Sequence, residues 1–329
     1  MQDAHAFSRT PIDQLYRGFA AEVEGSSPVW GRLCRWIAEH PEVNARLDAL
    51  PGRKRQANVF LGALKYLGGP TEPGPAFASW VDGHWGELER VILSRATQTN
   101  EPGRCAVLAP VLASLPQPIT LLEVGSSAGL CLLPDRFRYR FAGGPVVAPG
   151  AAASDAGVLD CAVEGTPPGD VTALEIAARA GLDLNPLDPR DPDDVRWLRA
   201  LVWPGEDARE ERLASSLAMA ARDAPPILVG DLRRDLDRLL DRVVGGTTPV
   251  LQHCAVLAYL PRPERDAFAR AVAAAGVHWI SYEGASIVTS VRDRLTDVAE
   301  WAGRPNFVVA LDGVPVARAS FHGAWVHWY

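Results

Sequence analysis

The sequence predicts an α/β fold in which a doubly wound, mostly parallel sheet with a C-terminal β-hairpin follows an all-helical N-terminal region. Apolar residues have helical spacing over residues 12–115, and from residue 119 onward apolar runs of strand length alternate with helical stretches. The composition agrees with this prediction. At 47% hydrophobic and 22% charged residues over 329 positions, the chain is typical of a globular protein with a sizeable core.

The N-terminal region is expected to contain helices only. Two sets of apolar residues recur at helical spacing: Tyr16, Phe19, Ala20 and Val23, then Val29, Leu33, Trp36 and Ile37. Further helices are expected over residues 58–67, which Gly68-Gly69-Pro70 ends, and over residues 80–93 and 102–115. We therefore predict a helical N-terminal or lid region at 1–116 and an α/β domain at 117–329.

The second part of the chain contains apolar runs of strand length. Parallel strands are expected at Ile119–Val124, Ile227–Gly230, Pro249–His253 and Val277–Tyr282. Asp312-Gly313 separates two alternating runs, Asn306–Leu311 and Val314–Ser320, and this pattern predicts a hairpin. Residues 137–141 and 158–164 are expected to pair, and residues 193–201 to form a helix. This outline is that of the class I methyltransferase fold.

Charge and cysteine usage exclude several classes of protein. The net charge of -7 argues against a nucleic-acid partner.

Residues 1–26 lack a signal-peptide pattern and no apolar run reaches the ~18 residues of a membrane span, so a cytoplasmic protein without a membrane partner is expected. The five cysteines are odd in number and never spaced as Cys-x-x-Cys, so they are expected as small buried hydrophobes and no metal site is predicted. The oligomeric state stays open.

A glycine turn is the main candidate for cofactor binding. The segment from Glu123 to Gly129 lies at the end of a strand and precedes an expected helix, so its N–H groups and the helix dipole could meet a ligand. Ser126 replaces the second glycine of a dinucleotide motif, and the acidic Glu123 suits a ligand with a cationic amino-acid head. We therefore expect S-adenosylmethionine at Glu123, Gly125, Ser126, Ser127 and Gly129. A purely structural turn is the alternative.

Carboxylates after two other strands are candidates for the adenosine part of the cofactor. Asp231 follows residues 227–230 and is expected beside the adenine, unless it caps a helix over residues 232–243. Asp183 is the candidate for the ribose hydroxyls, with Glu164 and Asp188 as competitors and a polar loop residue as the alternative.

Three residues near the carboxyl ends of strands are candidates for catalysis: His253, Tyr259 and Glu283. Because imidazole titrates near neutrality, His253 could be a general base, or else a hydrogen-bonded histidine that closes a strand. Glu283 could orient a substrate amine, or else cap a loop. No Gly-x-Ser-x-Gly elbow or P-loop is present, which disfavours hydrolase and nucleotide-triphosphatase functions.

The segment Thr97–Arg104 is expected to cover the cofactor. Gln98 and Asn100 offer donors and acceptors to an amino-acid head, and Arg104 would pair with the cofactor carboxylate or with Glu101. Helix capping by this segment is the structural alternative.

Several motifs resemble a known family. They are Thr97-Gln98-Thr99-Asn100-Glu101-Pro102-Gly103-Arg104, Glu123-Val124-Gly125-Ser126-Ser127-Ala128-Gly129-Leu130, Asp135-Arg136-Phe137-Arg138-Tyr139, Val202-Trp203-Pro204 and His253-Cys254-Ala255-Val256-Leu257-Ala258-Tyr259. With these motifs the chain resembles the bacterial domain of unknown function family 2332. The resemblance implies a methyltransferase-like fold and no settled reaction, and Cys131 stands where that family usually has asparagine.

Three functions remain as expectations. The first is an S-adenosylmethionine-dependent methyltransferase acting on a small-molecule substrate. The second is a nicotinamide-dependent oxidoreductase, and the third is a non-catalytic ligand-binding or interaction protein that kept the fold.

Overall fold

The computed structural model describes residues 10–152 and 157–329, which form two compact units. The helical unit contains residues 10–99 and 191–214, and the α/β unit contains residues 100–152, 157–190 and 215–329. This division differs from the expected boundary between residues 116 and 117. The last helix of the expected N-terminal region belongs to the α/β unit, and a segment from the middle of the chain joins the helical unit.

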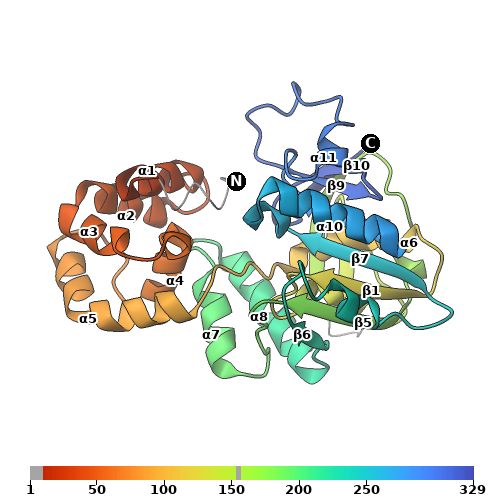
Figure 1. The fold of residues 1–329 in the computed structure, drawn as a ribbon, viewed down its shortest axis with the longest axis horizontal. Coiled ribbons are helices and arrows are strands. Elements are labelled where there is room, and N and C mark those ends of the chain that lie inside the picture. Colours follow the sequence, from red (N-terminus) through yellow and green to blue (C-terminus); the bar gives the residue numbers. More distant parts are fainter. Residues whose placement is uncertain (1–9, 153–156) are drawn as a thin grey trace. The chain divides into compact units, whose positions relative to one another are not determined.

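The helical unit is built from short amphipathic helices, drawn in red to orange for its N-terminal part in Figure 1. Its elements are α1 (Ile12–Glu22), α2 (Pro28–Glu39), α3 (Pro41–Asp48), the 3₁₀-helix η2 (Gly52–Lys54), α4 (Ala57–Tyr66), α5 (Pro75–Ser94), α7 (Pro192–Ala200) and the first half of α8 (Asp207–Arg222). Prolines occupy the first positions of α2, α3, α5 and α7, where no N–H is needed. The expectation of helices without strands is confirmed for the described part of residues 12–115.

The α/β unit contains one sheet with eleven strands in the order β3-β2-β4-β11-β10-β9-β8-β7-β1-β5-β6. The strands are β1 (Ile119–Val124), β2 (Arg138–Phe141), β3 (Val146–Val147), β4 (Val158–Glu164), β5 (Ile176–Asp183), β6 (Ile227–Val229), β7 (Thr248–Cys254), β8 (His278–Glu283), β9 (Phe307–Leu311), β10 (Val314–Ala319) and β11 (Trp325–Trp328). The mixed α/β class with a large, mostly parallel sheet is confirmed, and the sheet is larger than the expected one.

Five parallel strands form the part of the sheet that positions the candidate site. They lie in the order β6-β5-β1-β7-β8, and every neighbouring pair among them is parallel. Counted in chain order this is 3-2-1-4-5, the start of a doubly wound sheet. The direction of winding reverses between β1 and β7, and in such sheets ligands bind outside the carboxyl ends of the strands at that point.

The predicted C-terminal hairpin is confirmed. Strands β9 and β10 pair antiparallel around Asp312 and Gly313, whose φ angles of 52° and 75° are those of a type I′ turn. Strand β9 pairs antiparallel with β8, and the sheet continues through β11 to β4, β2 and β3. The expected pairing of residues 137–141 with 158–164 is also confirmed, as β2 beside β4.

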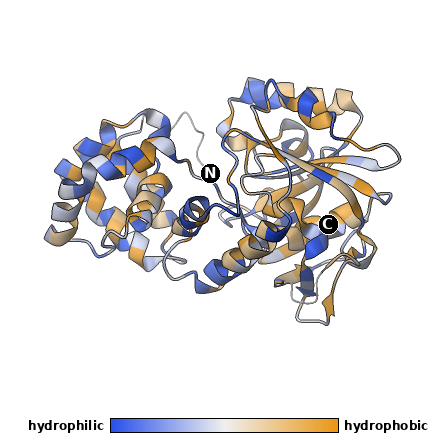
Figure 2. Ribbon diagram, turned by 90° about the horizontal axis from the view of Figure 1, so that it is seen from below, coloured by the Kyte–Doolittle hydropathy of each residue, from blue (hydrophilic) through white to orange (hydrophobic). Residues whose placement is uncertain are grey.

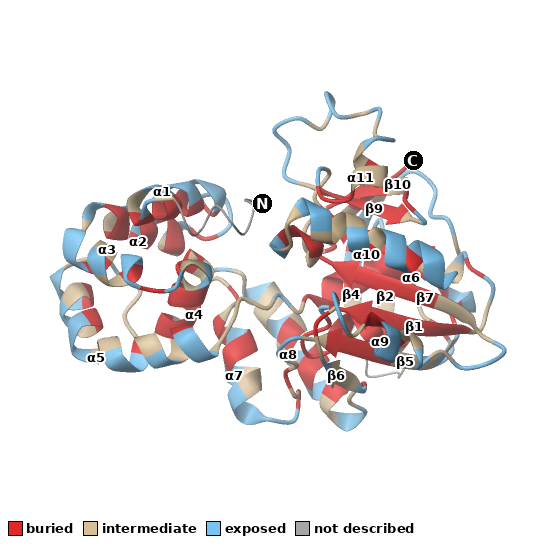
Figure 3. Ribbon diagram, in the orientation of Figure 1, coloured by how far each residue is buried: buried red, intermediate tan, exposed pale blue. Residues whose placement is uncertain are grey.

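Helices cover both faces of the five central strands. On one face an apolar cluster joins β1, β5, β7 and β8 to α9 (Leu236–Leu240), α10 (Arg262–Ala275) and α11 (Thr289–Arg292). The other face carries α6 (Cys105–Ala113), in which residues 105–112 are all buried. Strands β1 and β7 are buried over most of their length (Figure 3), whereas many helices interleave hydrophilic with hydrophobic residues (Figure 2).

Two expected helices differ from the structure. The glycine turn after β1 leads into the 3₁₀-helices η4 (Leu130–Leu132) and η5 (Pro134–Arg136) and then into β2, so no α-helix directs its dipole at the turn. The helix after Asp231 is shorter than residues 232–243 and begins only at Leu236. Within the described residues, no helix combines the length and apolar character that crossing a membrane requires.

Candidate functional site

The glycine turn lies at the carboxyl end of β1, where the winding of the sheet reverses. Left-handed φ angles recur at Gly125 (72°), Ser127 (53°) and Gly129 (75°). The Ser127 N–H donates to Asp183 Oδ2 at 2.8 Å, which ties the turn to the end of β5. Asn100 holds the turn from the other side, since its Nδ2 donates to the carbonyl oxygen of Ser126 at 2.9 Å and its Oδ1 accepts from the N–H of Leu130 at 3.1 Å.

The glycines of this region are required by close packing within the chain. A Cβ atom at Gly125 would lie 2.2 Å from Val256 Cγ2, and one at Gly129 would lie 2.4 Å from Pro225 Cγ. Gly181, beside Glu123 in the sheet, leaves room for Ser126, because a Cβ there would lie 2.3 Å from Ser126 Oγ. The turn is therefore a packed structure even without a ligand.

Three side-chain oxygens of the turn are buried without a hydrogen-bond partner among the described residues. They are Glu123 Oε2, Ser126 Oγ and Ser127 Oγ. A buried acceptor or hydroxyl without a partner costs about 1–3 kcal/mol, so three of them close together indicate a place where a polar ligand would be stabilising.

The carboxyl group of Glu123 is strongly affected by its burial. It is 3% exposed, and burial raises the pKa of its carboxyl group well above the usual range, with Cys131 adding to the effect. Its neighbour Gln252, which lies opposite it on β7, hydrogen-bonds the carboxyl group and acts in the other direction. A donor or cation that reached Glu123 would favour its charged form.

The structure separates the three carboxylates considered for a ribose. Asp183 ends β5, next to β1, and accepts hydrogen bonds from the N–H groups of Ser127 and Asn185 at 2.8 Å each. Burial raises the pKa of Asp183, although these two hydrogen bonds oppose the shift. Glu164 ends β4, which is separated from β1 by several strands, and Asp188 pairs with Arg190. Asp183 is therefore the carboxylate of the three whose side chain hydrogen-bonds the glycine turn, although Leu187, next to Asp188, also donates its N–H to the carbonyl oxygen of Ser127 at 3.1 Å.

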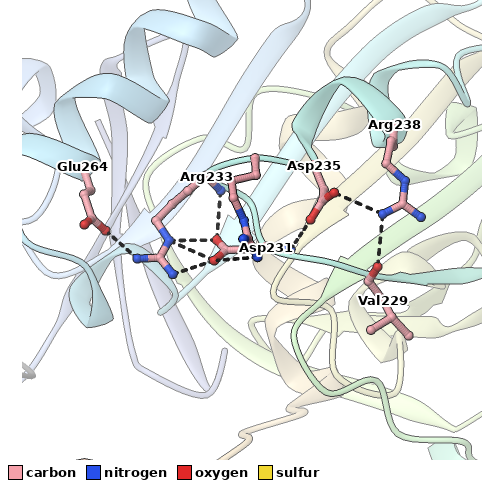
Figure 4. Close-up of polar contacts among 7 residues, drawn as sticks. Val229, Asp231, Arg233, Asp235, Arg238 and Glu264 are labelled. Atoms are coloured by element: carbon pink, nitrogen blue, oxygen red, sulfur yellow. Dashed lines mark hydrogen bonds and ion pairs between the residues drawn. The ribbon is translucent and has the colours of Figure 1, made fainter.

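Asp231 follows β6 but is already paired (Figure 4). Its oxygens accept from Arg233 Nε at 2.9 and 3.0 Å and from Arg233 Nη2 at 2.5 Å, and this pairing lowers the pKa of Asp231. Its own N–H donates to Asp235 Oδ2 at 2.8 Å. Asp231 Oδ1 also accepts the N–H of Arg233 at 3.0 Å, so Asp231 caps the turn that follows β6, as in the structural alternative. The helix itself is shorter than residues 232–243, because α9 begins only after Asp235.

His253 and Glu283 form a buried pair, at 0% and 2% exposure. His253 Nδ1 lies 2.9 Å from Glu283 Oε1, which also accepts the N–H groups of Val256 and Leu257 at 2.7 and 2.8 Å. Glu283 therefore holds the chain that follows β7. Tyr259, in the 3₁₀-helix η7 (Leu257–Tyr259), is exposed.

The segment before α6 connects two turns of the α/β unit. Asn100 holds the glycine turn, and the side chain of Glu101 accepts the N–H of Gly103 at 3.0 Å. Arg104, 4% exposed, donates from Nε to the carbonyl oxygen of Phe321 at 2.9 Å and from Nη1 to that of Cys254 at 3.5 Å. Gln98 belongs to the helical unit, whereas Asn100 and Arg104 belong to the α/β unit.

A group of thiols beside Glu123 was not predicted. The ligand atoms of Glu123, Cys131 and Cys254 all lie within 4.8 Å of one another, and all three residues are buried. Hydrogen bonds from Cys105 and Cys254 lower the pKa of the Cys131 thiol well below its usual range. Sequence spacing could not reveal this cluster, because Cys131 follows β1 and Cys254 ends β7, far away in the chain. All five cysteines are buried and free, as expected.

Comparison with known proteins identifies the family of the chain. No curated protein matches the chain. A family model described as an uncharacterized protein conserved in bacteria (DUF2332) matches residues 13–328, which is nearly the whole chain and includes the glycine turn, the thiol cluster and the His253–Glu283 pair. The chain therefore belongs to this bacterial family.

Proposed function

We propose that the α/β unit binds S-adenosylmethionine at the glycine turn and is a methyltransferase for a small-molecule substrate. The observation that carries this proposal is the set of three buried oxygens without partners, Glu123 Oε2, Ser126 Oγ and Ser127 Oγ, where the winding of the sheet reverses. The 3-2-1-4-5 order of the parallel strands supports it, as does the acidic residue two positions before Gly125.

The same residues suit the chemistry of this cofactor. Glu123 and the two serine hydroxyls would accept from the ammonium group of the amino-acid head. Asp183 accepts one hydrogen bond on each oxygen, and a carboxylate has about four acceptor sites, so it can still accept from ribose hydroxyls. Adenine contact with Asp231 would require Arg233 to move, so the fit is better for the amino-acid and ribose parts than for the base. When bound, the cofactor supplies an electrophilic methyl group on a sulfonium.

The turn is less suited to a nicotinamide dinucleotide. A pyrophosphate is usually stabilised by an α-helix N-terminus, and here a 3₁₀-helix follows the turn. Glu123 would also place a carboxylate near the phosphates.

A second candidate function is binding of S-adenosylmethionine without methyl transfer. It is favoured by the burial of His253 at 0% exposure and by its pairing with Glu283, which leave the expected base enclosed. A methyl acceptor that carries no proton needs no base, so this observation does not oppose transfer to such an acceptor.

Calorimetric titration of the full chain, in the presence of a chelator, with S-adenosylmethionine, S-adenosylhomocysteine, NAD and NADP tests the proposal. We expect the first two to bind and the double variant Ser126→Ala/Ser127→Ala to bind about 5–30-fold more weakly, from the loss of 1–2 kcal/mol of hydrogen bonding. Ser281→Ala is the control, because Ser281 is a buried serine on β8 outside the turn. Binding of NAD alone, or equal affinity in the double variant, would show the assignment to be wrong.

Transfer of a labelled methyl group to pooled small-molecule acceptors then separates the two candidates. Tight binding with labelled product supports the methyltransferase, and tight binding without product in acceptors of every class supports the non-catalytic protein.

A further inference from the structure

We propose that Glu123, Cys131 and Cys254 bind one Zn²⁺ ion in the interior of the α/β unit. Their donor atoms lie within 4.8 Å of one another, and Glu123 Oε2 is a buried carboxylate oxygen without a partner among the described residues. This inference goes beyond the proposed function, because a methyltransferase needs no such ion to position its cofactor.

The geometry is close to that of a zinc site. Zn–S bonds are about 2.3 Å and Zn–O bonds about 2.0–2.2 Å, so two donors of a tetrahedral ion lie about 3.5–3.8 Å apart. The three donor atoms here lie within 4.8 Å of one another. The donors come from the end of β1, from η4 and from the end of β7, and all three elements are fixed by the sheet or by the glycine turn. To bind one ion, the donor atoms would have to approach one another by up to about 1 Å through side-chain rotation.

The charges also favour a divalent ion. As metal ligands, two thiolates and one carboxylate carry three negative charges, which are costly to bury unless cations neutralise them. A divalent cation together with the guanidinium group of Arg104, which is 4% exposed and interacts electrostatically with Cys254 and Cys131, neutralises them. Thiolate ligands exclude Mg²⁺ and Ca²⁺, which prefer oxygen, and select Zn²⁺ or Cu⁺.

Neighbouring residues support the three ligands. The Cys105 thiol hydrogen-bonds Cys131 and is a candidate for a fourth donor. Gln252 Nε2 donates to the carbonyl oxygen of Cys131 at 2.7 Å and so holds η4 against β7. Such outer contacts orient the ligands of metal sites.

Glu123 belongs to both proposals, so the metal and the ammonium group of S-adenosylmethionine would compete for one carboxylate. The two proposals are tested separately, since metal binding is measured without any cofactor and cofactor binding is measured in the presence of a chelator.

The test uses the reduced, chelator-treated full chain. Titration with Co²⁺ should produce a thiolate-to-metal charge-transfer absorption that one equivalent of Zn²⁺ abolishes, and competition with a chromophoric chelator gives the Zn²⁺ affinity. We expect Cys131→Ser and Cys254→Ser each to bind Zn²⁺ at least tenfold more weakly. The matched controls Cys34→Ser and Cys161→Ser, also buried cysteines, should bind as the wild type does.

A second measurement keeps the proposal testable if the two serine variants do not fold. X-ray absorption of the zinc-loaded wild type should show at least two sulfur neighbours, and Zn²⁺ should raise its melting temperature. The absence of the charge-transfer band, zinc bound only by oxygen and nitrogen, or unchanged affinity in a folded Cys131→Ser variant would overturn the proposal. Tight binding of Cu⁺ with no binding of Zn²⁺ would overturn the choice of metal.

Discussion

The two faces of the sheet differ sharply at the end of β7, where His253 and Cys254 are consecutive and point to opposite sides. On the α10 side, one oxygen of Glu283 accepts three hydrogen bonds, and the His253 ring lies among the aromatic rings of Phe268 and Trp279. On the α6 side, Cys254 lies with Glu123 and Cys131, next to the buried cation Arg104. On the first face Glu283 Oε1 holds the main chain, although Glu283 Oε2 and His253 Nε2 are also buried without a partner among the described residues. The second face brings together a carboxylate and two thiols, which are donor atoms that suit a metal ion.

This difference teaches that strand position alone does not identify a site. Residues at the carboxyl end of a parallel strand alternate between the faces, so His253 and Cys254 reach different surroundings although both end the same strand. The following predictions test whether one face is structural and the other binds ligands, beginning with the largest expected effect.

Replacing Glu283 by Ala should remove the structural role of the α10 face. It leaves His253 Nδ1 and the N–H groups of Val256 and Leu257 without their acceptor, and at about 1–3 kcal/mol for each lost buried partner we expect a loss of roughly 4 kcal/mol in the free energy of unfolding. Urea denaturation followed by circular dichroism measures this loss. A loss below about 1 kcal/mol would contradict the structural role of the pair.

Replacing Gly125 by Val should destabilise the turn that connects the two faces. The residue has a φ of 72°, and its new Cβ would collide with Val256. Left-handed strain and overpacking together should cost roughly 3 kcal/mol, so loss of cofactor binding in this variant would not by itself identify a ligand contact. The double variant Gly125→Ala/Val256→Ala should recover part of the stability lost in Gly125→Ala. If it recovers none, close packing against Val256 is not the reason for the glycine.

Replacing Asn100 by Ala should loosen the glycine turn from the α6 side. Two hydrogen bonds to the turn are lost, and we expect a cost of about 1–2 kcal/mol. Hydrogen exchange should show faster exchange of the Leu130 amide and unchanged exchange of the Leu257 amide, which Glu283 holds. Equal acceleration at both amides would mean that the two faces are not independent.

At pH 5 the smallest effect is expected for Glu123→Gln, which keeps the shape of the side chain. Burial raises the pKa of Glu123 in the folded protein above its value in the unfolded chain. At pH values between these two pKa values the folded state binds more protons than the unfolded state. The wild type therefore loses stability as the pH rises from the unfolded pKa to the folded pKa. The variant lacks this titration. Its stability relative to the wild type should therefore increase from pH 5 to pH 8. Parallel stability curves for the two proteins would contradict the raised pKa.

Much of the fold could be predicted because local patterns agreed with tertiary structure. Apolar runs bounded by turn residues located β1, β6, β7 and β8, and Asp312-Gly313 located the hairpin. Strand β5 was anticipated only at its end near Asp183, because residues 176–182 are rich in alanine and form a strand through pairing with β1, with β6 joining only at residues 181–183. The expected α-helix after the glycine turn was wrong, since Pro134 follows soon after Gly129 and the chain turns into β2.

The sequence by itself determined the α/β class, the central strands and the glycine turn, because each depends on residues close together in the chain. Periodicity, turn residues and left-handed glycines are local properties. Only the tertiary structure decided which distant side chains meet. It placed Asp183 rather than Glu164 at the turn, paired His253 with Glu283, and brought Cys131 and Cys254 to Glu123, because sheet order and side-chain alternation set these contacts and neither can be read from spacing along the chain.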